Sequence, residues 1–194
     1  MPEEPSIHAT IELICAAFGG DDPTLACEIS REQVLDWMHS RDIQVQGCVL
    51  AMICDFDRAK HITPQLGFED YYGFVVPHLI RCIEENPDSQ WVNSRYIAGY
   101  DLVKWITTFW KDETVPRAIL VEIKQRLADL YKSGDEGVRD AVLNAVLEHL
   151  FENGQLADFF KDWQDDPVLA HVYQDALLWR QEMPPGVGRL FRSE

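Results

Sequence analysis

The feature that most constrains this chain is a helical spacing of apolar residues over its second half. From residue 94 onward, apolar side chains recur three or four positions apart, as they do on one face of an α-helix. Ser94 and Asp135 are suited to cap helix starts, and Gly134 is suited to end a helix in the left-handed conformation. The pattern predicts helices over residues 95–111, 114–132, 135–152, 156–163 and 168–181.

The first half indicates helices less uniformly. We expect helices over residues 7–18, 30–39 and 68–85, with a kink or a break in the last of these near residues 73–77, because Pro77 lies inside it. Residues 45–56 are almost continuously apolar, and they fit a buried helix or a buried strand. A helix is favoured there, because a single strand would have no partner to pair with.

These elements predict an all-α fold, either a multi-helix bundle or HEAT-like layers of antiparallel helices. The loops between the predicted helices are short, and the length of 194 residues suits one domain. We therefore expect a single helical domain over residues 1–183. Residues 184–194 are predicted to form an irregular tail, because prolines and glycines interrupt any regular element.

Charge limits the classes of partner. The chain carries 17 basic and 33 acidic residues, a net charge of −16. Residues 1–30, 55–93 and 140–175 are acidic blocks, whereas residues 94–139 are close to balanced. Because nucleic acids and anionic lipids are bound largely through lysine and arginine, the composition disfavours both, and it favours a basic protein partner.

The residues give little support for catalysis or metal binding. Asp57 and His61, and likewise His78 and Cys82, lie four positions apart, but two ligands do not complete a zinc site. No nucleophile signature or phosphate-binding glycine loop is present. The five cysteines form no CxxC pair and the N-terminus is acidic, so we expect buried thiols in a cytoplasmic protein. The sequence predicts a protein without enzymatic activity, cofactor or metal.

Two acidic segments that contain a tryptophan are the candidate partner-binding sites. A tryptophan supplies contact area that is easily desolvated, and carboxylates steer a basic partner toward it. If the tryptophans are exposed, each segment could anchor such a partner; if not, they belong to the core. The candidate residues are Asp158, Asp162, Trp163, Asp165 and Asp166 in the first segment, and Glu84, Glu85, Asp88 and Trp91 in the second.

The segments IAGYDLVKW, LYKSGDEGVRDAV, LEHLFE and FFKDWQDDPVLAHVYQDALLW, within residues 96–179, resemble a group of uncharacterised bacterial all-helical proteins. Some members of that group look like immunity proteins of toxin delivery systems. The resemblance implies a small cytosolic protein that binds and neutralises a toxin, and it implies no catalytic residue.

The leading hypothesis is therefore an acidic, all-helical inhibitor of a basic toxin, for which a nuclease is one candidate. The alternatives are a helical-repeat scaffold or adaptor that inhibits nothing, and a metal-dependent hydrolase with a site built from scattered carboxylates and histidines. Oligomeric state, the identity of the partner and the acidic block that meets it stay open.

Overall fold

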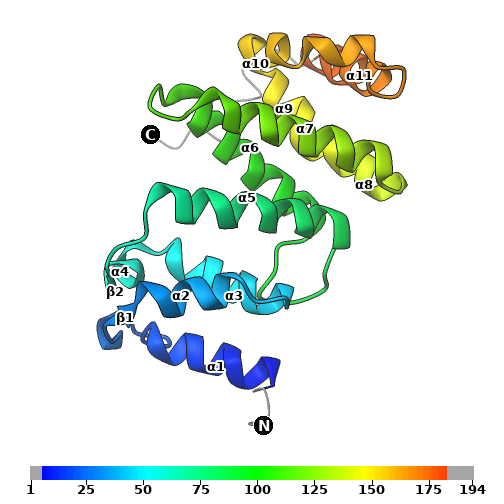
Figure 1. Cartoon of the computed structure of the whole chain (residues 1–194). Helices are drawn as coiled ribbons and strands as arrows, with labels where there is room; N and C mark the ends of the chain where they lie inside the picture. Colours follow the sequence, from blue (N-terminus) through cyan, green and yellow to red (C-terminus); the bar gives the residue numbers. More distant parts are fainter. Residues whose placement is uncertain (1–5, 183–194) are drawn as a thin grey trace. The chain divides into compact units, whose positions relative to one another are not determined.

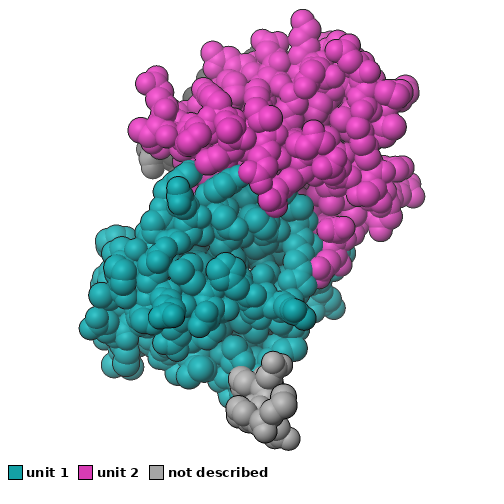
Figure 2. Space-filling model, viewed as in Figure 1, with its two compact units in different colours: residues 1–82, 86–94 teal, residues 83–85, 95–194 magenta. Residues whose placement is uncertain are grey.

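The computed structural model describes residues 6–182, and helices make up most of them (Figure 1). The predicted all-α fold is confirmed. The chain divides into two compact units, residues 1–82 with 86–94 and residues 83–85 with 95–194 (Figure 2). The prediction of one domain over residues 1–183 stays a prediction, and the predicted tail over residues 184–194 lies outside the described residues. No helix within residues 6–182 is long and apolar enough to cross a membrane.

The first unit is built around a buried central helix. Its elements are α1 (Ile7–Ala17), η1 (Pro23–Leu25), β1 (Ile29–Ser30), α2 (Arg31–Met38), α3 (Ile43–Ile53), α4 (Phe56–Ala59), β2 (Ile62–Thr63) and most of α5 (Phe68–Glu85). Helix α3 packs on α1 and α2, and Cys48 and Val49 at its centre are fully buried. The helix favoured over residues 45–56 is therefore confirmed by α3.

Short-range signals set the ends of these elements. The Ser30 hydroxyl accepts a hydrogen bond from the amide of Gln33 and caps α2, as its sequence pattern predicts. Strand β1 forms a two-residue parallel pair with β2, in which Ile29 lies opposite Ile62. This pair lacks the alternating apolar pattern by which a strand is recognised in sequence, because each strand is only two residues long.

The sequence predicts a kink or a break near residues 73–77, and the break is not found, because α5 runs through Pro77 as one continuous helix. The turns around Pro77 bury Val75, Val76 and Leu79. Burial of these side chains offsets the hydrogen bond that Pro77 cannot donate. Tertiary packing thus overrides the local preference of proline.

The second unit contains the longer helices of the second half. Its elements after residues 83–85 are α6 (Arg95–Lys111), α7 (Arg117–Ser133), α8 (Glu136–Ala141), η2 (Val142–Leu147), α9 (Glu148–Phe151), α10 (Gly154–Phe159), η3 (Lys161–Asp165) and α11 (Leu169–Glu182). Segment η2 is π-helical and continues directly from α8 into α9. Asp135 caps α8 by accepting a hydrogen bond from the amide of Val138.

Gly134 ends α7 without the predicted left-handed conformation, because its backbone is extended, with φ −71° and ψ 155°. A Cβ at this position would lie 2.4 Å from a methyl carbon of Val138 and 2.7 Å from the carbonyl oxygen of Leu130. The glycine therefore permits a close approach of the chain and not a positive φ.

The core of the second unit forms where α6, η2 and the C-terminal helices meet. A Cβ added at Gly99 of α6 would lie 2.6 Å from the Cβ of Ala145, so these two helical segments approach as closely as glycine allows. Aromatic rings fill the other side: Phe151 packs edge-on against Tyr173, with ring centroids 5.2 Å apart. Helices α7 and α10 and segment η3 carry charged side chains at their exposed positions.

Candidate functional site

The first candidate segment has its tryptophan in the core. Trp163 on η3 is 3% exposed, and its ring packs edge-on against Phe160 with centroids 5.0 Å apart. Of the two possibilities that the sequence left open for Trp163, an exposed anchor or a core residue, the structure shows the core residue. Its burial follows from its position in η3, which packs closely on α11.

Lysines of the same unit neutralise half of the carboxylates in that segment. Lys124 of α7 forms an ion pair with Asp162, and Lys132 forms one with Asp166 at 2.5 Å. Bonding to Lys132 lowers the pKa of Asp166 below its ordinary value. Between the two ion pairs lies a small hollow of about 220 Å³. Asp158 and Asp165 are exposed and form no ion pair within residues 6–182.

The second candidate segment follows the end of α5. Glu84, Glu85 and Asp88 are exposed, as predicted for a charged surface, and Trp91 is half-buried. The backbone of Trp91 is packed against α3, since its carbonyl oxygen lies 2.0 Å from where a Cβ of Gly47 would be. Trp91 is thus fixed in the first unit and is not a freely exposed ring.

A hollow lies in the first unit, between α2 and α5, which are labelled in Figure 1. Its volume is about 440 Å³, within the range of sites that bind small molecules or side chains. We call it the α2–α5 groove. It is lined by Leu35, Met38 and His39 of α2, Gln46 of α3, and Glu69, Asp70, Gly73, Phe74, Pro77, His78 and Arg81 of α5.

An ion pair holds the two walls of the groove together at one end. Arg31 donates from Nε and Nη2 to the two carboxylate oxygens of Asp70, at 2.9 Å and 2.6 Å. The same carboxylate accepts a hydrogen bond from the amide of Gly67 and so caps α5. The bonded Arg31 guanidinium, followed by this amide, lowers the pKa of Asp70 below its ordinary value. Two parallel bonds of this kind fix direction as well as distance.

A buried network forms the polar wall of the groove. His78 is 3% exposed, and its Nδ1 lies 3.3 Å from Oε1 of Gln46. Because Nε2 of Gln46 donates to the carbonyl oxygens of Met38 and Ser40, its Oε1 accepts from His78. In the neutral ring this leaves Nε2 of His78 to accept from the thiol of Cys82, 3.5 Å away. Cys82 is completely buried, so its thiol is out of reach of solvent.

The middle of the groove is open at one turn of α5. A Cβ added at Gly73 would meet no atom within 4 Å, so nothing in the fold requires a glycine there. Pro77, one turn later, has no N–H and cannot donate to the carbonyl oxygen of Gly73. At this turn, α5 therefore has space beside it and a carbonyl oxygen, that of Gly73, without the backbone N–H donor of a regular helix.

Exposed carboxylates lie on both helices of the groove. Glu69 is in the first turn of α5, where the helix dipole favours negative charge. Glu32 and Asp36 lie one turn apart on α2, and the first of them follows directly after Arg31. Within residues 6–182 none of these three forms an ion pair. The sequence contained the signals for this site in Gly73 and Pro77, but the pairing of α2 with α5 could not be inferred.

No group of three or more histidine, cysteine or acidic side chains within the described residues could hold a metal ion. Comparisons with protein-family models, curated proteins and solved structures return no match to this chain. The resemblance to immunity proteins therefore stays a prediction.

Proposed function

We propose that this protein is an acidic, non-catalytic binding protein that neutralises a basic partner protein, as an immunity-type inhibitor neutralises a toxin such as a nuclease. The observation that supports this proposal is a difference between basic and acidic side chains in how many have partners. Within residues 6–182, most basic side chains form hydrogen bonds or ion pairs, whereas several exposed carboxylates form no ion pair.

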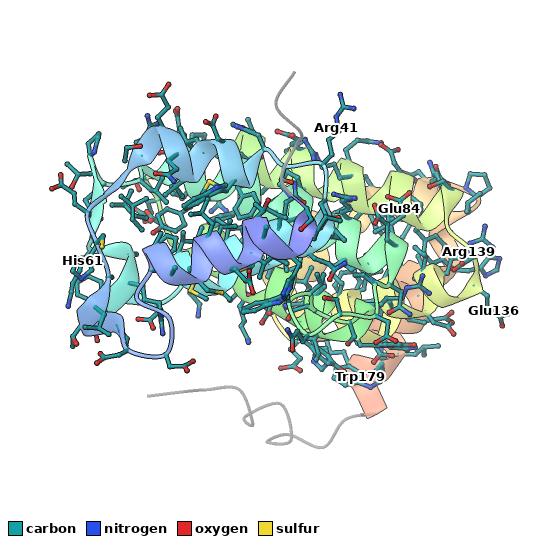
Figure 3. All side chains as sticks on the ribbon, turned by 90° about the horizontal axis from the view of Figure 1, so that it is seen from below. Arg41, His61, Glu84, Glu136, Arg139 and Trp179 are labelled. Atoms are coloured by element: carbon teal, nitrogen blue, oxygen red, sulfur yellow. The ribbon has the colours of Figure 1, made fainter. Side chains whose placement is uncertain are left out.

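Arginines illustrate the engaged cations. Arg58 is held by the carbonyl oxygens of Phe18 and Gly20, to which its Nη1 donates at 2.7 Å and 2.8 Å. Arg139, labelled in Figure 3, donates from Nε to the carbonyl oxygen of Tyr131 at 3.1 Å. A cation bound in this way has limited freedom to meet an anion on another molecule.

The carboxylates behave in the opposite way. Glu32, Asp36 and Glu69 in the first unit are exposed and form no ion pair within the described residues. The same holds for Asp158 and Asp165 in the second unit. Each unit therefore presents exposed carboxylates that form no ion pair with a lysine or arginine of residues 6–182.

Such surfaces suit a partner that must itself be basic. A nuclease carries lysine and arginine around its phosphate-binding groove, so an acidic protein that covers this groove excludes the nucleic acid. Attraction between opposite charges also raises the association rate by about tenfold to a thousandfold at low salt.

The test is capture with the intact protein as bait in extracts of its source cell, followed by an activity assay of the captured protein. We expect a basic protein in a stoichiometric complex, with its activity suppressed on binding. A captured partner that is neutral or acidic, or one whose activity is unchanged in the complex, contradicts the proposal.

Charge-reversal variants locate the surface on that partner. We expect Glu32→Lys with Asp36→Lys, or Asp158→Lys with Asp165→Lys, to weaken binding about tenfold or more. The matched control is Asp21→Lys with Glu113→Lys, which changes the net charge equally at exposed positions outside both surfaces. Equal weakening by all three pairs would show a general charge effect and no specific interface.

A further inference from the structure

The α2–α5 groove contains a glycine and a proline that the helix itself does not need. Glu69, Gly73 and Pro77 succeed one another at four-residue intervals along α5, and all three line the groove. They therefore share one face of the helix. Glycine at an exposed position in the middle of a helix lowers stability by about 0.5–1 kcal/mol relative to alanine, and an internal proline lowers it further.

This face presents hydrogen-bond acceptors without donors. The carbonyl oxygen of Gly73 lacks the N–H that residue 77 would supply in a regular helix, because that residue is proline. The carboxylate of Glu69 is exposed one turn earlier and forms no ion pair within residues 6–182. A ligand that satisfies both groups must carry N–H donors, and a positive charge on it would be favoured.

The arginines of the groove already donate hydrogen bonds within the first unit. Arg31 is paired with Asp70 through two hydrogen bonds. Arg81 donates from Nη1 to the carbonyl oxygen of Arg41 at 3.0 Å and to Oε1 of Gln46 at 3.3 Å. The side chain of Arg41 itself points away from the helices (Figure 3).

An apolar surface lies beside these acceptors. Phe74 follows Gly73 on α5 and is 7% exposed, and Met38 on α2 is 2% exposed. Both line the groove together with Leu35. A volume of about 440 Å³ holds more than one side chain, so the space suits a cationic group with an apolar neighbour.

We infer that the α2–α5 groove binds a lysine or arginine side chain together with an adjacent apolar side chain from an extended segment of the partner protein. The ammonium or guanidinium group donates to Glu69 and to the carbonyl of Gly73, and the apolar side chain packs on Phe74 and Leu35. This inference rests on the proposed function, since it names the part of the basic partner that binds to this protein.

The direct test uses a labelled synthetic peptide in which lysine alternates with leucine and phenylalanine. Two matched peptides replace either every lysine by glutamate or every apolar residue by alanine. Fluorescence anisotropy measures affinity for the intact protein, and amide chemical shifts locate the binding site. We expect the first peptide to shift the amides of Leu35, His39 and Gly73, and both matched peptides to bind on the order of tenfold more weakly.

Variants that preserve the fold separate binding from stability. Gly73→Leu places a side chain in the open turn, and Ala51→Leu adds the same side chain at an exposed position on α3 as a control. Pro77→Ala restores the N–H that occupies the Gly73 carbonyl. We expect Gly73→Leu and Pro77→Ala to weaken peptide binding while the midpoint of urea unfolding stays equal or rises, and Ala51→Leu to bind as the wild type does.

The results show separately whether the groove assignment or the proposed function fails. If the lysine peptide or the captured basic partner binds Gly73→Leu as tightly as wild type, the groove is not the site, although the protein still binds a basic partner. Binding of the glutamate peptide equal to that of the lysine peptide also overturns the groove assignment. If neither the lysine peptide nor any basic protein binds the wild type, both proposals fail.

Discussion

Replacing Gly73 by alanine should make the protein more stable. The added Cβ meets no atom within 4 Å, so no clash opposes it. Alanine restricts the unfolded chain more than glycine does, and it fits the backbone of α5 without strain. The expected gain in the free energy of unfolding is about 0.5–1 kcal/mol.

Gly99→Ala is the matched substitution at a closely packed glycine. Its Cβ would lie 2.6 Å from the Cβ of Ala145 and 3.3 Å from a methyl carbon of Val146. Overpacking of this kind costs about 1–3 kcal/mol, which exceeds the gain in helix propensity. We expect a net loss of about 1–2 kcal/mol, so the two glycine-to-alanine changes should have opposite signs.

Urea unfolding followed by far-ultraviolet circular dichroism measures both effects. The midpoint should rise for Gly73→Ala and fall for Gly99→Ala, with slopes equal to that of the wild type. A Gly73→Ala variant that is less stable than the wild type would refute the reasoning, because it would show that the open turn of α5 is needed by the fold itself.

Four further results follow from the structure. Trp163→Ala should lower the free energy of unfolding by about 3–5 kcal/mol in the same urea assay, because the ring is in the core. Burial raises the pKa of Glu148 above its ordinary 4.5. The native state therefore loses stability as pH rises from about 4.5 through the raised pKa of Glu148. The Glu148→Gln variant should be more stable than the wild type at neutral pH but not in acid. The pKa of Asp70 is lowered, so the ionised carboxylate stabilises the native state above about pH 3.8, and this contribution is lost as pH falls through the lowered pKa. In the Asp70→Asn variant, the urea midpoint should therefore depend less on pH in that window. Burial raises the pKa of Cys48 to about 12. Iodoacetamide at neutral pH should therefore alkylate the exposed Cys27 and leave Cys48 unmodified until urea unfolds the protein. Mass spectrometry of the digested peptides measures both modifications.

The helices could be predicted because their signals are local. Residues 68–85 and 95–111 were expected as helices and correspond to α5 and α6. Caps and apolar spacing act over a few residues, so they are visible in one sequence. At Pro77 the sequence predicted a kink or a break, and α5 does not break there, because buried residues on both sides hold the helix together.

The candidate site could not be predicted in the same way, because it depends on contacts between distant residues. Lys124 and Asp162 are 38 residues apart, and their pairing removes charge from a surface that looks uniformly acidic in the sequence. Arg31 and Asp70 are 39 residues apart, and their pairing brings α2 beside α5. Periodicity also could not show that Trp163 is buried, since η3 is too short to define a face.

The central claim is that exposed carboxylates draw a basic partner to this protein. Stopped-flow measurement of the association rate with the captured partner, at increasing concentrations of sodium chloride, tests it most directly. We predict a rate that falls about tenfold or more as salt rises from well below to above the physiological range, with a smaller change in the dissociation rate. An association rate that does not depend on salt would contradict the claim.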